Sequence, residues 1–128
     1  MHKTFLLSGS LLAGLAVVLG AFGAHGLKKI VSPETVASFQ TGVQYEMYHA
    51  LALLLLGILY ERFGGNMLQW AGILFLVGIL LFSGSIYLAA GLTGLKKDVP
   101  IFVRLITPLG GISFIAGWIL LLIGLMKK

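Results

Sequence analysis

The sequence predicts an all-α integral membrane protein, a bundle of four transmembrane helices that forms one domain over residues 1–128. Hydrophobic residues make up 59% of the chain and charged residues only 10%, which is more apolar surface than a soluble core of this length could bury. The apolar residues gather in four runs close to the ~20 residues that a helix needs to cross a bilayer. Backbone groups in hydrocarbon must be hydrogen-bonded within their own segment, so these runs are expected to be helices.

The predicted spans cover about residues 4–26, 43–62, 67–92 and 108–126, and the segments that join them are too short for a second domain. The first run follows Lys3 and passes small residues at Ala21–Gly23, as a secretory signal peptide would. Its apolar stretch is longer than a signal core, so we expect it to be retained as the first span.

A helix start precedes the second span. Ser32, Pro33 and Glu34 supply an N-cap residue, a first-turn proline and a first-turn acid. From there to Arg62 nothing breaks the helix, and roughly thirty residues at 1.5 Å each give ~45 Å, more than the hydrocarbon requires. The stretch up to Gly42 is therefore predicted to be a short interfacial helical segment before span two.

The fourth span is predicted to begin at Thr107 and Pro108, which resemble an N-cap residue followed by a first-turn proline. The alternative is a start at Pro100. That start would place Pro108 inside the helix and leave the carbonyl of Arg104 without its hydrogen bond.

Small residues form a stripe on span one and another on span four. They are Gly9, Ala13, Ala16, Gly20 and Gly23, and then Gly110, Gly117 and Gly124. Such stripes let helix backbones approach closely. We expect spans one and four to pack through Gly20 and Gly117, and the stripes to support a homo-oligomer.

The net charge of +5 lies mostly beside the ends of the spans, where cations meet lipid headgroups. The predicted headgroup contacts are Lys28, Lys29, Lys96, Lys97 and Arg104. Membrane lipids are therefore expected partners and nucleic acid is not. The chain has no cysteine, which excludes disulfide, thiolate-metal and iron–sulfur chemistry, and no cofactor is expected.

Polar side chains from all four spans are expected at the end of the bundle that carries the Lys28–Lys29 pair, because successive spans alternate in direction. Polar residues in membrane segments usually face the bundle interior or a cavity. The predicted ligand-binding residues are His25, Gln44, Tyr45, Tyr48, His49, Ser83, Tyr87, Thr107, Gly110 and Gly111. Glu46 and His49 are three residues apart and are expected to pair.

Several interpretations of this polar cluster stay open. It can be a hydrogen-bond network that only fixes helix packing, or a pocket for a lipid headgroup or small polar ligand. In the second case the first-turn N–H groups at Gly110 and Gly111 would favour an anion. His25 and His49 with Glu46 or Tyr48 could in principle hold a metal, but no metal-ligand spacing repeats, and no metal site is predicted.

Four motifs in order resemble the YgdD/YwdK family of small bacterial inner-membrane proteins, a domain of unknown function. They are Gly20–Gly26, Val43–Ala50 with the preceding Phe39, Phe82–Tyr87, and Thr107–Gly111 with the following Gly117–Trp118. The resemblance covers essentially the whole chain. It implies a four-helix, multi-pass protein of the bacterial inner membrane, and it implies no reaction.

The favoured function is that of a non-enzymatic membrane protein whose polar pocket near one membrane face binds a lipid headgroup or a small polar ligand. One alternative is a small proton-coupled transporter, which needs a buried acid. Glu46 is the candidate, and its expected pairing with His49 counts against that role. The other alternative is a membrane-embedded metal or acid–base enzyme that uses His25, His49 and Tyr48. A Ser–His–Asp arrangement is not expected, because the only aspartate, Asp98, lies in a loop. No catalytic residue is predicted.

Overall fold

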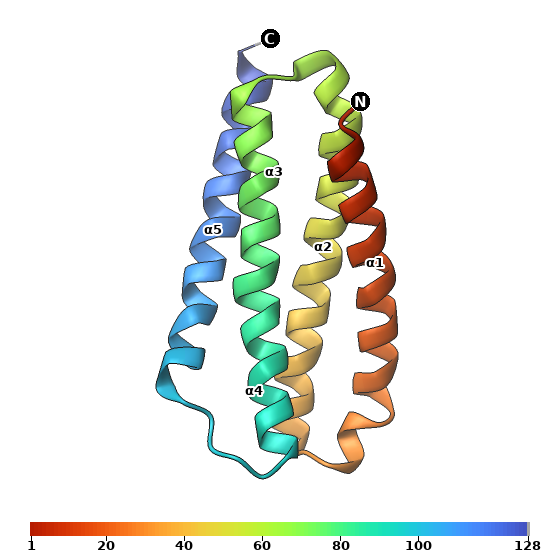
Figure 1. The fold of residues 1–128 in the computed structure, drawn as a ribbon, viewed down its shortest axis with the longest axis vertical. Helices are drawn as coiled ribbons and strands as arrows, with labels where there is room; N and C mark the ends of the chain where they lie inside the picture. The colour runs from red at the N-terminus through yellow and green to blue at the C-terminus, as the bar shows by residue number, and fades with distance from the viewer. Residues whose placement is uncertain (128) are drawn as a thin grey trace.

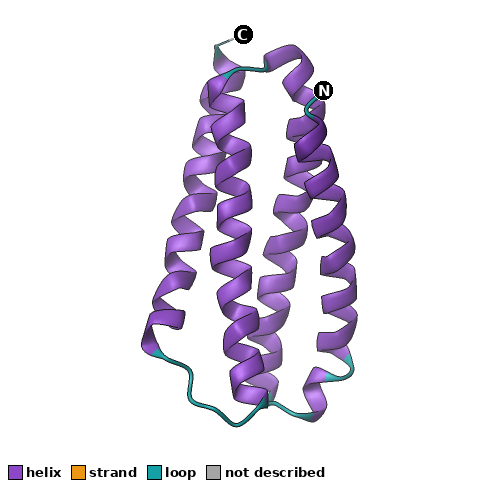
Figure 2. Cartoon of the chain, in the orientation of Figure 1, coloured by secondary structure: helices purple, strands orange, loops and turns teal. Residues whose placement is uncertain are grey.

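The computed structural model describes residues 1–127, and it is a bundle of four long helices with both termini at the same end (Figure 1). The helical segments in order are α1 (Lys3–Ala24), a short 3₁₀ turn (Leu27–Lys29), α2 (Pro33–Phe63), α3 (Asn66–Gly78), a π-helical turn (Ile79–Ser83), α4 (Gly84–Gly94) and α5 (Ile101–Met126). Because α3, the π turn and α4 follow one another without a break, they form one long helix. Four helices are long and apolar enough to cross a membrane. No strand occurs within the described residues (Figure 2), so the predicted all-α fold class is confirmed.

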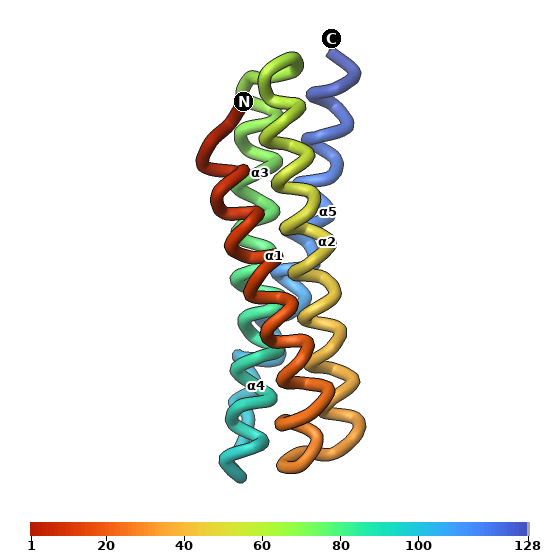
Figure 3. The backbone as a smooth tube through the Cα atoms, turned by 90° about the vertical axis from the view of Figure 1, so that its right-hand side faces the viewer, coloured from red at the N-terminus to blue at the C-terminus, as the bar shows by residue number. Residues whose placement is uncertain are grey.

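The helices pack as two close pairs, α1 with α2 and α3 with α5, and α1 and α5 lie on opposite sides of the bundle (Figure 1). The view in Figure 3 shows α1 running alongside the other helices. Near the termini Phe5 of α1 is only 1% exposed, and its ring lies where a Cβ at Gly72 of α3 would be. The main core continues through Leu53, Leu56, Leu68 and Phe75. The predicted packing of spans one and four through Gly20 and Gly117 is therefore wrong.

The two stripes of small residues serve these pairs inside a single chain. A Cβ added at Gly9 would lie 2.8 Å from the carbonyl oxygen of Ala50 on α2. A Cβ added at Gly117 would lie 2.8 Å from the ring of Phe75 on α3. The buried glycines of both stripes are thus covered by neighbouring helices of the same chain, so they offer no surface to a second copy. Homo-oligomerisation stays a prediction, but the buried glycines of these stripes cannot form its interface.

The predicted interfacial segment is helical and, as expected, it continues without a break into the second span as the first part of α2. Ser32 is the N-cap as expected, and its hydroxyl accepts a hydrogen bond from the backbone N–H of Thr35 at 3.3 Å. The helix then continues unbroken through Gly42, which is buried against Ile86 and Tyr87 of α4. Because α4 packs on this part of α2, the segment belongs to the bundle.

The predicted start of the fourth helix at Pro108 is wrong, because α5 begins at Ile101 and Pro108 lies in its interior. Proline in a helix interior removes one backbone hydrogen bond, which disfavours this arrangement locally. Tertiary packing offsets that loss. Val103 is only 1% exposed, and the hydroxyl of Thr107 bonds to Ser85 of α4 instead of capping a helix.

The π-helical turn at Ile79–Ser83 is not predicted by the helical periodicity of the sequence. A π turn inserts an extra residue into the α-helical repeat, so the buried face beyond it continues on a shifted set of residues. Beyond the turn, Ser85, Ile86 and Ala90 are buried. Ser83, at the end of the turn, is 0% exposed and donates a hydrogen bond of 2.7 Å to the carbonyl of Gly42 on α2. The turn therefore sets which polar residues of α4 face the interior.

Candidate functional site

The two histidines that were expected to share a ligand lie far apart. His25 is exposed just past the end of α1, and its Nδ1 contacts the backbone oxygen of Ala21 at 2.9 Å. The nearby Gly23 packs against Phe39 of α2, whereas His49 lies about 15 Å further along that helix at 1.5 Å per residue. The prediction of a common site for His25 and His49 is therefore wrong.

His49 is instead locked between α2 and α5. It is 4% exposed. Its ring stacks on that of Phe114, with the ring centroids 3.6 Å apart and the ring planes inclined by 9°. The indole N–H of Trp118 lies 3.0 Å from His49 Nε2, and His49 Nδ1 lies 2.8 Å from the backbone oxygen of Tyr45. An indole can only donate, so Nε2 accepts and Nδ1 carries the proton. Both ring nitrogens are thus occupied, which leaves neither for a metal or a substrate.

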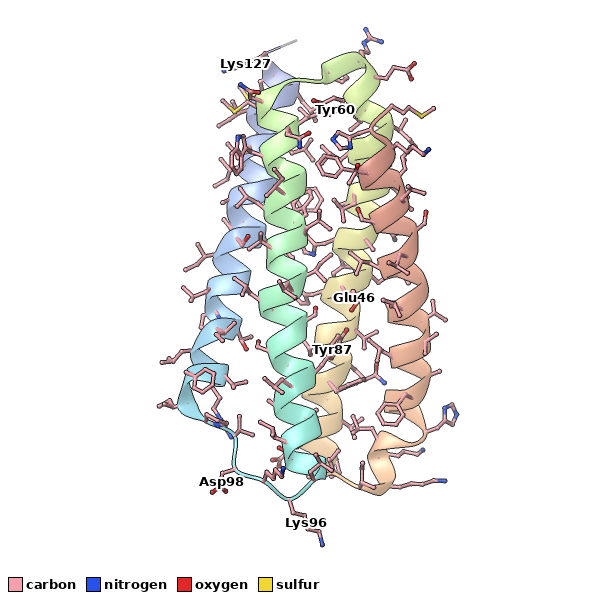
Figure 4. The ribbon with its side chains drawn as sticks, in the orientation of Figure 1. Glu46, Tyr60, Tyr87, Lys96, Asp98 and Lys127 are labelled. Carbon is pink, nitrogen blue, oxygen red and sulfur yellow. The ribbon has the colours of Figure 1, made fainter. Side chains whose placement is uncertain are left out.

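Glu46 pairs with Tyr87 rather than with His49, so that prediction is also wrong. The Tyr87 hydroxyl donates a hydrogen bond of 2.8 Å to Glu46 Oε1 (Figure 4). The two α2 residues turn to different neighbours, because Glu46 meets α4 while His49 meets α5. Glu46 is 3% exposed, and its second oxygen, Oε2, has no hydrogen-bond partner within residues 1–127.

The remaining predicted ligand-binding residues do not form one pocket. Gln44, Tyr45 and Tyr48 lie on the outer surface of α2, where Tyr45 packs against Phe82 at a centroid distance of 4.7 Å. Gly110 and Gly111 are internal to α5, so the proposed first-turn anion site does not exist there. Gly110 is buried against the backbone of Phe82.

Ser83, Ser85 and Thr107 tie helices together. Ser83 joins the π turn to α2, as described above, and Ser85 bonds to Thr107 across α4 and α5. The interpretation as a packing network fits these three residues. Ser85 and Thr107 also border an open cleft, which gives them a second possible role.

This cleft lies between the first turns of α2, the helix α4 and the start of α5, and its volume is about 560 Å³. It is at the end of the bundle where α5 diverges from α4 in Figure 1. Its polar and charged lining residues are Glu34, Thr35, Ser38, Ser85, Thr93, Arg104 and Thr107. Ile86, Ala89, Ala90, Val99 and Val103 supply the apolar part of the wall. We call it the polar cleft.

Two opposite charges border the polar cleft, Glu34 from α2 and Arg104 from α5. Within the described part of the chain, neither side chain makes an ion pair or a hydrogen bond. The other predicted headgroup contacts, Lys28, Lys29, Lys96 and Lys97, are exposed at the same end of the bundle but do not line the cleft. The structure therefore separates Arg104 from the lysine pairs.

Sequence reasoning missed Glu34, Thr35, Ser38 and Thr93 as members of the site. The available signal was the spacing of Glu34, Ser38 and Thr41, which places polar residues on one side of the first turns of α2. These turns are predicted as an interfacial segment before span two, so they do not enter the predicted site. Across residues 1–127 no cluster of three or more His, Asp or Glu side chains could hold a metal ion.

Comparison with known proteins identifies relatives along nearly the entire chain. A family described as "Protein of unknown function (DUF423)" matches residues 19–111. The UPF0382 membrane protein YwdK of Bacillus subtilis is 41% identical over 126 residues, which cover 98% of both chains. The UPF0382 inner membrane protein YgdD of Escherichia coli is 37% identical over 128 residues, covering 99% of this chain and 93% of that one. No solved structure matches the chain.

The family match includes every residue that lines the polar cleft, together with Glu46 and Tyr87. It confirms the resemblance seen in the four motifs, and the relatives are named as membrane proteins, in agreement with four helices that can span a bilayer. The chain is a multi-pass protein of the cell membrane that belongs to the DUF423 family and is related to YwdK and YgdD.

Proposed function

We propose that the polar cleft binds the phosphate-bearing headgroup of a membrane lipid, or a small polar anion of the same chemistry, and that the chain is a non-enzymatic binding protein. The observation that carries this proposal is Arg104. Its side chain borders a cleft lined by hydroxyl groups, and it has no protein partner among the described residues. A guanidinium in such a position is available to an anionic ligand.

The chemistry of the lining suits a phosphate group. Arginine donates two parallel hydrogen bonds to phosphate or carboxylate oxygens, and these charge-assisted bonds are stronger than neutral ones. Thr35, Ser38, Thr93 and Thr107 add hydroxyl groups that can donate or accept. A volume of about 560 Å³ lies within the range of small-molecule sites.

The carboxylate of Glu34 refines the expected ligand. It borders the same cleft as Arg104, so a purely anionic ligand meets repulsion from it. A zwitterionic headgroup, with phosphate toward Arg104 and an ammonium group toward Glu34, matches both charges. Ile86, Ala89 and Val103 provide apolar contacts for the adjoining part of a lipid.

The metal or acid–base enzyme has less support. It needs His25 and His49 in one site, but His25 lies at the surface and both nitrogens of His49 are engaged. Glu46 bonds to Tyr87 and not to His49, so pairing with His49 does not count against the alternative of a small proton-coupled transporter.

The test is the lipid that copurifies with the protein in mild detergent, measured by native mass spectrometry. We expect Arg104→Met to lose bound phospholipid, while Lys97→Met keeps it, because Lys97 is a cation at the same end but outside the cleft. Thermal unfolding with inorganic phosphate separates the two ligand sources. Stabilisation by free phosphate that disappears in Arg104→Met would identify a small anion. Equal lipid retention and equal phosphate response in both variants would contradict the proposal.

A further inference from the structure

The buried carboxyl of Glu46 is not explained by the polar cleft, which it does not line. It lies where α2 meets α1 and α4. Gly42, one turn earlier, packs against Tyr87 of α4, and Val43 and Ala50 on the adjacent positions face the small residues Gly20 and Gly9 of α1. A side chain 3% exposed at this position is surrounded by protein on both sides.

The hydrogen bonding of this carboxyl is incomplete. Oε1 accepts one hydrogen bond from Tyr87, and Oε2 has none within residues 1–127. Ionised carboxyl groups in a membrane interior normally pair with a cation or with several donors, because an uncompensated charge there is strongly disfavoured. A proton on Oε2 would remove the charge and leave the bond from Tyr87 intact.

Other titratable groups near Glu46 do not supply a counter-charge. Helix α1 carries only Lys3, at its far end, and α4 contributes only Tyr87. On α2 itself Tyr45 and Tyr48 cannot carry a positive charge, and the nearest group that can, His49, has both of its nitrogens bonded elsewhere. Among residues 1–127 no cation compensates the carboxylate, which leaves a proton or a ligand for that role.

Tyr87 connects this buried group with an accessible surface. Its side chain lines an apolar groove of about 290 Å³ between the end of α1 and α4, together with Leu19, Phe22, Phe39 and Ala90. The groove extends to Ile30 and Leu95, which are 60% and 69% exposed at the lysine-bearing end of the bundle. The phenol thus stands between the groove and Oε1 of Glu46.

We propose that Glu46 holds an exchangeable proton in the core of the bundle, and that Tyr87 is the positioning residue between this proton site and the apolar groove. Such a site is what a proton-coupled membrane protein requires. This proton site is separate from the polar cleft, because neither Glu46 nor Tyr87 lines that cleft.

The test is modification by N,N′-dicyclohexylcarbodiimide, an apolar reagent that partitions into membranes and reacts with protonated carboxyl groups. The acid proton moves to a carbodiimide nitrogen while a carboxyl oxygen bonds to the central carbon, and an acyl shift then leaves a stable N-acylurea. No further reactant is needed. The intact protein in lipid vesicles is treated over a series of pH values and mapped by peptide mass spectrometry, with Glu34 and Glu61 as internal comparators.

We expect Glu46 to be labelled several-fold more than the exposed Glu34 and Glu61, and its labelling to fall as the pH rises. Glu46→Gln should lose the label. Tyr87→Phe, which removes the one hydrogen bond to the carboxyl, should shift the pH profile of the label. An absence of label at Glu46, or a label that stays constant with pH in the wild-type protein, would overturn the proposal without any variant. An unchanged profile in a folded Tyr87→Phe protein would overturn the role of Tyr87.

Discussion

Trp118 of α5 donates its indole N–H to Nε2 of His49 on α2, at 3.0 Å, and this bond fixes an imidazole that is only 4% exposed. Phe114 and Phe75 pack against the same imidazole, at ring distances of 3.6 and 5.4 Å. A histidine in the middle of a membrane bundle is thereby held as a packing residue. It links α2, α3 and α5 at one level.

Trp118→Phe is expected to destabilise the protein, because it leaves Nε2 of His49 buried without a donor. The substitution keeps an aromatic ring beside Phe75, so it mainly removes the hydrogen bond. An unsatisfied buried acceptor costs about 1–3 kcal/mol. The measurement is the Tm of the purified protein in detergent. Trp70→Phe is the control, since Trp70 is 56% exposed, and it should leave the Tm almost unchanged. Equal shifts in the two variants would mean that the indole bond contributes nothing.

The sequence predicts the helices of this protein well, because the requirement to satisfy the backbone in hydrocarbon depends only on local composition. It does not predict which helices are neighbours. Gly20 and Gly117 both lie on stripes that favour close packing, but a stripe does not specify its partner. In the structure Gly20 meets Val43 of α2 and Gly117 meets Phe75 of α3.

The candidate site was harder to predict for a related reason. Helical periodicity places Glu46 and His49 on one side of α2, yet the two side chains turn to different neighbouring helices. The π turn before Gly84 adds a further change of face that periodicity does not reveal. At Pro108 the preference of proline for the first turn predicts a helix start. Packing of residues 101–107 as helix overrides that preference. The sequence therefore indicates which polar residues lie in the spans, but tertiary contacts decide which of them lie together.

Gly9→Ala and Gly14→Ala form a matched pair within α1. A Cβ at position 9 would lie 2.8 Å from the backbone oxygen of Ala50, whereas a Cβ at position 14 has no neighbour within 4 Å. We expect Gly9→Ala to separate α1 from α2 and to lower the Tm. Gly14→Ala should leave the Tm unchanged or raise it slightly, because alanine favours a helix by up to about 1 kcal/mol over glycine. A similar response at both positions would contradict the packing of α1 on α2.

Lys96→Gly is expected to stabilise the end of α4. Lys96 has a φ of 60°, and the N–H groups of Lys96 and Lys97 bond back to the carbonyls of Thr93 and Leu92. This pattern is a Schellman cap, in which glycine is the preferred residue because a Cβ is strained at positive φ. The gain should be on the order of 1 kcal/mol, measured as a rise in Tm. Lys97→Gly removes the same charge without relieving strain, so it should not raise the Tm.

Pro108→Ala tests whether the proline inside α5 lowers the stability of the protein. Pro108 is exposed, so its replacement removes little packing, and the new N–H can bond to the carbonyl of Arg104 within the helix. A hydrogen bond contributes about 1 kcal/mol, and we expect the Tm to rise accordingly. Pro100→Ala is the control, because Pro100 is the N-cap of α5, where no helical carbonyl awaits its N–H. A fall in Tm for Pro108→Ala, with no change for Pro100→Ala, would show that the proline ring stabilises the bundle by some contact of its own.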